Sequence, residues 1–244
     1  MEWDRRWRET CEAPESLTWG VKVDGQQVLD AFLSLGCSIG PASVVVEVGP
    51  GYGRIFEAFH KRFQFKRWYM VEINPKYCEI LLSELVDDRV KVLCQDVRKL
   101  DLPEKFDVGI STLVIEHLYP DFVEGLAQLR KFIKRQGCFV FDLPLPSEDR
   151  RMHECYEQKV FKGSIVNFYS EEWLRRLVEL SGFSIDVWTT VDYEEARIVR
   201  NLYRLKPNRK IANWQDRRLA SIEHSLEVLE RDLAVIKLKS DISC

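Results

Sequence analysis

Three glycines alternate with other residues directly after the apolar run 44–48, at Gly49, Gly51 and Gly53. Glycine adopts positive φ and lets another molecule approach the backbone closely, because it has no Cβ. A helix is expected over 54–60, and the free N–H groups at its start would point to the same place. The turn therefore predicts a binding site for a small polar ligand. A tight turn without a ligand is the alternative.

An acidic residue follows each of the next two expected strands. Glu72 comes directly after the run 65–71, and Asp96 follows the run 90–94. A carboxylate beside a glycine turn suits a ribose diol, because it accepts both hydroxyl protons in charge-assisted hydrogen bonds of about 1.5–3 kcal/mol each. Asp96 is able to accept from an exocyclic amine. Either acid alone reads as a solvated loop carboxylate, but two of them after successive strands favour a nucleotide-like ligand.

The spacing of the glycines separates two kinds of nucleotide-like ligand. A dinucleotide fingerprint needs a third glycine at the position of Arg54, whose side chain would obstruct close packing of helix on strand. The chain instead reads Glu-x-Gly-x-Gly-x-Gly from Glu47 onward. This pattern favours S-adenosylmethionine and leaves an NAD-dependent oxidoreductase as a distant alternative.

In their order and spacing, these blocks resemble the class I S-adenosylmethionine-dependent methyltransferases between about residues 41 and 207. The resemblance implies that the glycine turn holds the methionine portion, that Glu72 binds the ribose and that Asp96 lines the adenine site. The run 106–112 resembles the strand from which relatives offer a backbone carbonyl to the ammonium group. No metal is expected. The expected cofactor-binding residues are Glu47, Gly49, Pro50, Gly51, Gly53, Glu72, Ile73, Asp96, Val97, Ser111 and Thr112.

The rest of the pattern supplies elements that would hold these residues at one edge of a sheet. Apolar residues at helical spacing predict helices over 122–134 and 171–180, and a continuous apolar run predicts a buried strand over 138–143. Further strands are expected over 184–190 and 197–205. Alternating strands and helices predict an α/β fold with a doubly wound, mostly parallel sheet, which binds ligands at the carboxyl ends of its strands. The resemblance implies seven strands with the last antiparallel.

Methyl transfer requires alignment of donor and acceptor and, for a hydroxyl or a protonated amine, also a base. Glu116 and His117 lie just past the expected fourth strand and are the candidate catalytic residues, although this dipeptide also occurs in the fold without a catalytic role. Segment 144–169 mixes cations and aromatic residues, which would suit an anionic or aromatic acceptor, or could simply be surface charge. Its candidate substrate-binding residues are Arg150, His153, Tyr156 and Tyr169.

The expected function is therefore transfer of a methyl group from S-adenosylmethionine to an oxygen or nitrogen nucleophile of a small molecule. The chain lacks the Asn/Asp-Pro-Pro-Tyr block of relatives that methylate adenine or glutamine amide nitrogens. A basic stretch over 197–210 keeps RNA open as an acceptor, but the net charge is -3 and no RNA-binding module is appended. The same motifs would also suit a protein methyltransferase or a non-catalytic scaffold that binds the cofactor.

The composition is that of one domain with extensions, since 45% of the 244 residues are hydrophobic and 31% are charged. We expect a helical cap over 1–40, the cofactor-binding domain over 41–207 and a C-terminal helix over 208–244. No apolar run reaches the roughly 18 residues of a membrane span. The seven cysteines form no close pair in the sequence, which favours free thiols and a cytoplasmic location.

The C-terminal helix carries an apolar stripe with a heptad rhythm over 214–239. Apolar residues spaced alternately three and four apart form the a/d seam of a coiled coil. The stripe predicts a homo-oligomer, with docking of the helix on its own domain as the alternative. Its residues are Leu219, Ile222, Leu226, Leu229, Leu233 and Ile236.

Overall fold

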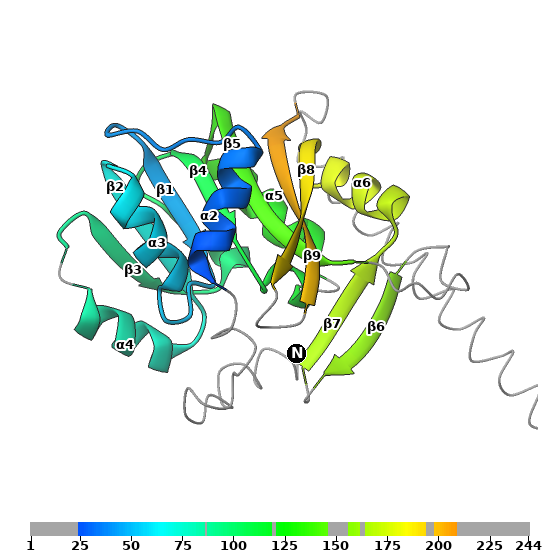
Figure 1. Ribbon diagram of the computed structural model, residues 1–244, viewed down its shortest axis with the longest axis horizontal. Helices are drawn as coiled ribbons and strands as arrows, with labels where there is room; N and C mark the ends of the chain where they lie inside the picture. Colours follow the sequence, from blue (N-terminus) through cyan, green and yellow to red (C-terminus); the bar gives the residue numbers. More distant parts are fainter. Residues whose placement is uncertain are drawn as a thin grey trace, which may run out of the picture.

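Seven strands form one sheet in the order β3-β2-β1-β4-β5-β9-β8. The computed structural model describes residues 24–85, 87–118, 121–145, 156–161, 164–193 and 198–208. The strands β1 to β5 pair in parallel, and β9 runs antiparallel between β5 and β8, which confirms the predicted class of fold (Figure 1). The strands are β1 Val44–Val48, β2 Arg67–Glu72, β3 Val90–Cys94, β4 Phe106–Ser111, β5 Ile133–Pro144, β8 Phe183–Tyr193 and β9 Ile198–Pro207.

Helices cover both faces of this sheet (Figure 1). One face packs against α2 (Gly25–Ser34), α3 (Arg54–Arg62) and α4 (Pro75–Glu84), and the other against α5 (Phe122–Phe132) and α6 (Glu171–Leu180). The strands explain this division, because successive side chains of a strand point to opposite faces.

In β1, Val44, Val46 and Val48 join the core on the α5 side, and Val45 joins the core on the α3 side. Glu47 therefore faces α3, although it is surrounded by valines in the sequence.

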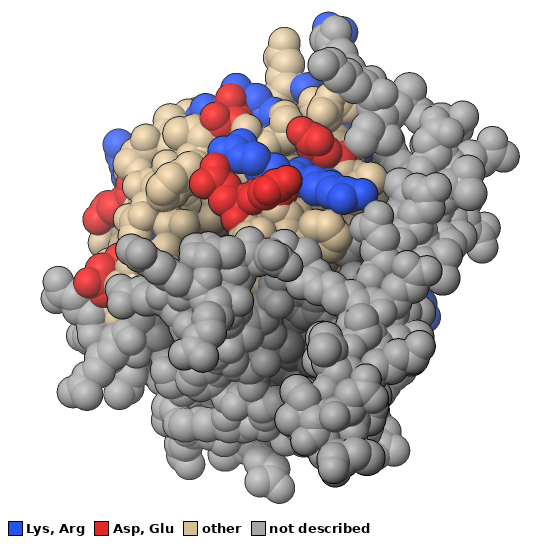
Figure 2. Space-filling model, turned by 90° about the vertical axis from the view of Figure 1, so that its right-hand side faces the viewer, with Lys and Arg blue, Asp and Glu red and all other residues tan. Residues whose placement is uncertain are grey.

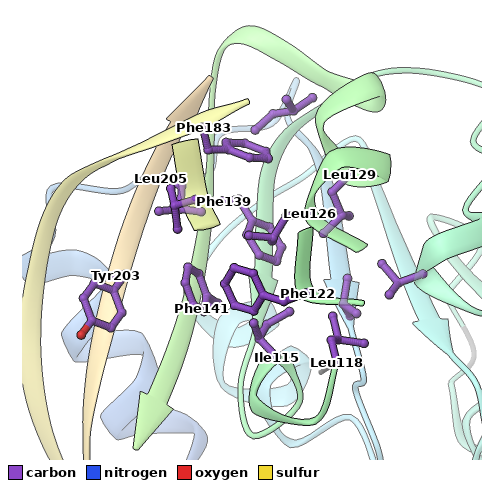
Figure 3. Packing of buried hydrophobic residues seen from close by; sticks show 14 of the residues in the cluster. Ile115, Leu118, Phe122, Leu126, Leu129, Phe139, Phe141, Phe183, Tyr203 and Leu205 are labelled. Atoms are coloured by element: carbon purple, nitrogen blue, oxygen red, sulfur yellow. The ribbon is translucent and has the colours of Figure 1, made fainter. Parts of the chain in front are cut away.

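The core on the α5 side combines aliphatic side chains with a row of stacked aromatic rings (Figure 3). The ring of Phe141 lies 6.0 Å from that of Phe139 and 5.6 Å from that of Tyr203. Leu126 and Leu129 of α5 are fully buried against these rings, at the spacing of three that the sequence predicts. This packing fixes β5 and β9 side by side.

The helix α5 ends at Phe132, two residues before its predicted end, and β5 already begins at Ile133. The pairing of β4 with β5 shifts register between Phe106 and Val108, so extra residues of β5 are accommodated there. A Cβ on Gly137 would lie 2.6 Å from the carbonyl oxygen of Asp107. This glycine therefore allows a close approach of β4 and β5.

A separate two-stranded sheet, β6 (Tyr156–Phe161) with β7 (Ser164–Tyr169), lies between β5 and α6 in the chain and was not predicted. Its second strand packs against the short 3-10 helix η4 (Ile115–His117), which follows β4. The hairpin is thereby held beside the carboxyl edge of the large sheet.

Two predicted segments fall wholly or partly outside the described residues. They are the C-terminal helix over 214–239 and the part of the N-terminal cap over 1–23, of which α2 is the described remainder. None of the helices in the described ranges is long and apolar enough to cross a membrane.

Candidate functional site

The glycine turn connects β1 to α3 and has the backbone that its composition predicts. Gly49, Gly51 and Gly53 have φ values of 68°, 56° and 79°, all in the left-handed region. A Cβ on Gly49 would lie 2.2 Å from Cγ2 of Val114, whereas a Cβ on Gly51 would meet nothing within 4 Å. Gly49 is thus required by packing inside the protein, and Gly51 leaves open backbone that a ligand can approach.

This difference between the two glycines leads to a prediction about stability. Gly51→Ala incurs only the strain of a left-handed conformation, about 1–2 kcal/mol. Gly49→Ala adds overpacking against Val114, so its loss of unfolding free energy is expected to be about 1–3 kcal/mol larger. Urea unfolding of both variants measures the difference. Equal losses would contradict the packing role of Gly49.

The carboxylate of Glu72 joins the end of β2 to the glycine turn. Its Oε1 accepts from the backbone N–H of Asn74 at 2.9 Å, and its Oε2 accepts from the N–H of Gly51 at 3.3 Å. The side chain is 6% exposed, and burial raises its pKa while these backbone donors oppose the rise. Each oxygen keeps a further lone pair, which is what a carboxylate needs to accept two hydroxyl protons.

Asp96 follows β3, and both of its oxygens are engaged by an arginine. Arg98 donates its Nε to Oδ1 and Oδ2 at 3.0 Å each, and its backbone N–H to Oδ1 at 2.9 Å. The same arginine pairs with Asp121 in front of α5. An amine donor would therefore have to share Asp96 with Arg98, a partner that was not predicted.

Ser111 and Thr112 end β4 and tie it to its neighbours. The hydroxyl of Ser111 donates to the carbonyl oxygen of Val48 at 3.0 Å, which joins β4 to β1. Thr112 Oγ1 accepts from Arg54 Nη2 at 3.1 Å, which joins β4 to α3. Arg54, where a dinucleotide site would carry a third glycine, thus turns its side chain in toward the edge of the sheet.

Glu47 is a fully buried acid behind the glycine turn. Its Oε2 accepts from Trp68 Nε1 at 3.0 Å, and its Oε1 has no hydrogen-bond partner among the described residues. Burial raises the pKa of Glu47 to about 7, although the Trp68 hydrogen bond and the charge of Arg54 act against the rise. The carboxyl group is thus able to change its charge near neutral pH.

A second buried group of charges lies beyond β4. Arg200 of β9 donates its Nε to Asp142 Oδ2 at 2.8 Å and its Nη2 to Glu116 Oε1 at 2.7 Å. All three residues are at most 4% exposed. Desolvation lowers the pKa of Arg200, but the two carboxylates outweigh it and raise that pKa above its ordinary value. Glu116 is therefore held in an ion pair, whereas its neighbour His117 is partly exposed.

Arg54, Asp142 and Arg200 were not predicted as parts of a site. A signal was present, because Asp142 and Arg200 are charged residues inside otherwise apolar strands, and buried charges in such strands need partners. The prediction that Arg200 belongs to a basic stretch on the surface is wrong, because its guanidinium is buried between two carboxylates.

The predicted cofactor-binding residues all lie near the carboxyl ends of four neighbouring parallel strands. Glu47 and the glycine turn, with the buried Pro50, lie at the end of β1; Glu72 and Ile73 at the end of β2; Asp96 and Val97 just after β3; and Ser111 and Thr112 at the end of β4. The strand order reverses between β1 and β4, which is where open α/β sheets bind ligands. The open backbone at Gly51 beside buried Glu72 fits a ribose-bearing ligand.

The predicted acceptor-binding residues are only partly described. Arg150 and His153 lie outside the described residues, and of Tyr156 only the backbone of β6 is described. Tyr169 is 5% exposed, and its ring lies 5.3 Å from that of Phe122. Its ring therefore anchors β7 to the core on the α5 side.

Comparison with known proteins agrees with this geometry. Residues 46–141 match the family described as "Methyltransferase domain". A 142-residue stretch is 22% identical to malonyl-[acyl-carrier protein] O-methyltransferase of Priestia megaterium, covering 55% of this chain and 52% of that protein. The chain thus spans about half the length of this curated relative.

Solved structures share the fold. One is 1,6-didemethyltoxoflavin-N1-methyltransferase of Burkholderia thailandensis with bound 1,6-didemethyltoxoflavin and S-adenosylhomocysteine, at a TM-score of 0.63 and 17% identity over 80% of this chain and 82% of that one. Another is the glycopeptide N-methyltransferase MtfA with S-adenosylhomocysteine, at a TM-score of 0.60 and 17% identity over 75% of this chain and 90% of that one.

These matches agree with the resemblance that the motifs carry: residues 46–141 match a methyltransferase domain, and the chain shares the fold of S-adenosylmethionine-dependent methyltransferases.

Proposed function

We propose that this protein transfers a methyl group from S-adenosylmethionine to an oxygen or nitrogen nucleophile of a small molecule. The observation that carries the proposal is the contact between Glu72 and the N–H of Gly51, which couples a buried carboxylate to open backbone at the switch point of the sheet. When bound, the cofactor supplies a methyl group already activated by its sulfonium.

The protein's own contribution is to bind and orient the two reactants. Glu72 holds the ribose hydroxyls, the glycine turn holds the methionine portion, and the residues after β3 and β4 complete the site. Such alignment lowers the activation barrier by up to about 7–11 kcal/mol in favourable cases. The side chains at this edge are tied to backbone or to each other, so little ordering is needed on binding.

The acceptor is proposed to approach from the side of segment 144–169. The support is that β7 packs against η4, which carries His117 and directly follows β4. Arg150, His153 and Tyr156 are the proposed acceptor contacts, and Tyr169 acts by anchoring the hairpin to Phe122.

Of the two candidate bases, His117 is the one we retain for proton transfer. Glu116 is buried and bound by Arg200, so its carboxylate is committed to an ion pair. His117→Gln would lower turnover of an acceptor that needs a base. The exposed His60 on α3 offers the control variant His60→Gln.

A small molecule is favoured over RNA because the predicted basic stretch is largely neutralised where it is described. Arg200 is buried, and Asp186 binds Arg204 at 2.8 Å and Lys206 at 2.9 Å. Acidic and basic side chains also interleave on the described part of the face in Figure 2. Phosphate binding would require unpaired cations gathered on one surface.

The function is tested in two stages. Calorimetry with S-adenosylhomocysteine should detect binding, and its absence would refute the cofactor site. A screen of small metabolites with a labelled methyl donor should then identify the acceptor. Binding without turnover of any acceptor, RNA and protein included, would indicate a non-catalytic scaffold instead.

We further propose that the chain self-associates through residues 214–239, in the cytoplasm. The support is the heptad stripe in the sequence and, for a reducing compartment, the free thiols of Cys37, Cys78, Cys94 and Cys138. Removal of the residues after Asn208 should lower the mass measured by sedimentation equilibrium to that of a single chain. A full-length protein that already sediments as a monomer would refute association through the tail.

A further inference from the structure

Leu113, directly after Thr112, has a backbone conformation that leucine rarely adopts. Its φ is 60°, and it is the one non-glycine residue with positive φ in the described part of the chain. Its N–H donates to Asp142 Oδ1 at 2.8 Å. The next residue, Val114, packs on Gly49 of the glycine turn. The position of residues 113–116, a turn after β4 that contacts the glycine turn through Val114, therefore depends on the carboxylate of Asp142.

This hydrogen bond also sets the direction of the preceding carbonyl group. In a trans peptide the C=O of one residue and the N–H of the next point in opposite directions. The N–H of Leu113 points to Asp142 on β5, and β4 lies between β5 and β1. The carbonyl of Thr112 consequently points away from the carboxylate of Asp142.

Arg200 holds the groups that maintain this arrangement. Its Nε binds Asp142 Oδ2 at 2.8 Å, and its Nη2 lies 3.2 Å from Asp142 Oδ1, the atom that accepts from Leu113. The same Nη2 binds Glu116 at 2.7 Å, three residues further along the turn. One buried guanidinium thus restrains both ends of residues 113–116.

We propose that Arg200 is a positioning residue for the cofactor. Acting through Asp142 and Glu116, it fixes residues 113–116 so that the carbonyl of Thr112 faces the amino group of the cofactor's methionine portion. The inference rests on the proposed function and adds a residue of the last strand to the site.

The test compares two ligands that differ in the methionine portion. S-adenosylhomocysteine carries the amino group, and 5′-methylthioadenosine lacks the whole amino-acid portion. Arg200→Met should weaken binding of S-adenosylhomocysteine by about 10- to 100-fold, the range for one hydrogen bond to a charged group. Binding of 5′-methylthioadenosine should change by less than about threefold. Calorimetry measures both affinities.

Two further variants keep the test decisive. Arg200→Lys retains the charge but loses the planar set of donors. It should therefore weaken binding of S-adenosylhomocysteine less than Arg200→Met does, and it should again leave binding of 5′-methylthioadenosine almost unchanged. It replaces Arg200→Met if that variant does not fold, because leaving two buried carboxylates without their partner is strongly destabilising. Arg204→Met, in the same strand but paired with Asp186, should leave both affinities unchanged.

An equal loss for both ligands, or none for either, in folded Arg200 variants would overturn the inference. Failure of the cofactor assignment is distinguishable, because the unaltered protein would then bind neither ligand, and a failure of turnover alone would leave this comparison of affinities unchanged.

Discussion

Replacement of Glu72 by alanine is expected to lower the affinity for S-adenosylhomocysteine by about 10²- to 10⁴-fold. Two hydrogen bonds from ribose hydroxyls to a carboxylate contribute about 1.5–3 kcal/mol each, and both are lost. The variant also leaves the N–H groups of Gly51 and Asn74 without their acceptor, so the glycine turn is less well ordered before binding.

Calorimetry measures this affinity, and two variants of similar chemistry serve as controls. Glu72→Gln keeps one oxygen acceptor and should fall between the wild type and the alanine variant. Glu79→Ala removes an exposed acid from the neighbouring helix α4 and should bind normally. Normal binding by Glu72→Ala would remove the ribose assignment and with it the main support for the cofactor site.

The second large effect concerns stability and pH. The pKa of Glu47 rises from 4.5 to about 7 in the folded protein, chiefly through burial. The folded state therefore keeps a proton that the unfolded chain releases, and stability falls as pH rises from about 4.5 to about 7. At 1.36 kcal/mol for each pH unit, the fall amounts to about 3 kcal/mol.

Glu47→Gln should lack this fall, because glutamine is neutral throughout and still accepts from Trp68. Urea unfolding at pH 5 and pH 8 gives the two free energies for each protein, and the quantity of interest is the difference between wild type and variant. Glu57→Gln, an exposed change on α3, is expected to follow the wild type. If Glu47→Gln loses as much stability between pH 5 and pH 8 as the wild type does, Glu47 is not the group responsible for the pH dependence.

Much of the fold could be predicted because local patterns determine it. The runs 44–48 and 90–94 became β1 and β3 with these bounds, and α6 has the predicted bounds of 171–180. The hairpin of β6 and β7 was missed, since its mixture of charges and aromatic residues has neither helical nor strand periodicity. The end of α5 was placed two residues too late, because the shift in register between β4 and β5 that begins there is visible only in the tertiary structure.

The candidate site divides in the same way. Glu72 and Asp96 could be found because each follows a strand, and the carboxyl ends of parallel strands share one edge. The contacts of Arg200 could not be found by such reasoning. Its partners Asp142 and Glu116 are 58 and 84 residues away in the chain, and the register that pairs Pro144 with Arg200 brings them together. Arg98 was missed for a different reason. Its partner Asp96 is close in sequence, but Asp96 was predicted to bind the ligand.

The direction of β9 affects the order in which the binding edge forms while the chain is synthesised on the ribosome. Because β9 runs opposite to its neighbours, its beginning, where Arg200 lies, reaches the same edge as the ends of the earlier strands. A nascent chain that has exposed only β1 to β5 possesses the glycine turn and Glu72 but leaves Asp142 and Glu116 without their cation. Completion of the binding edge therefore awaits the emergence of the last strand of the sheet.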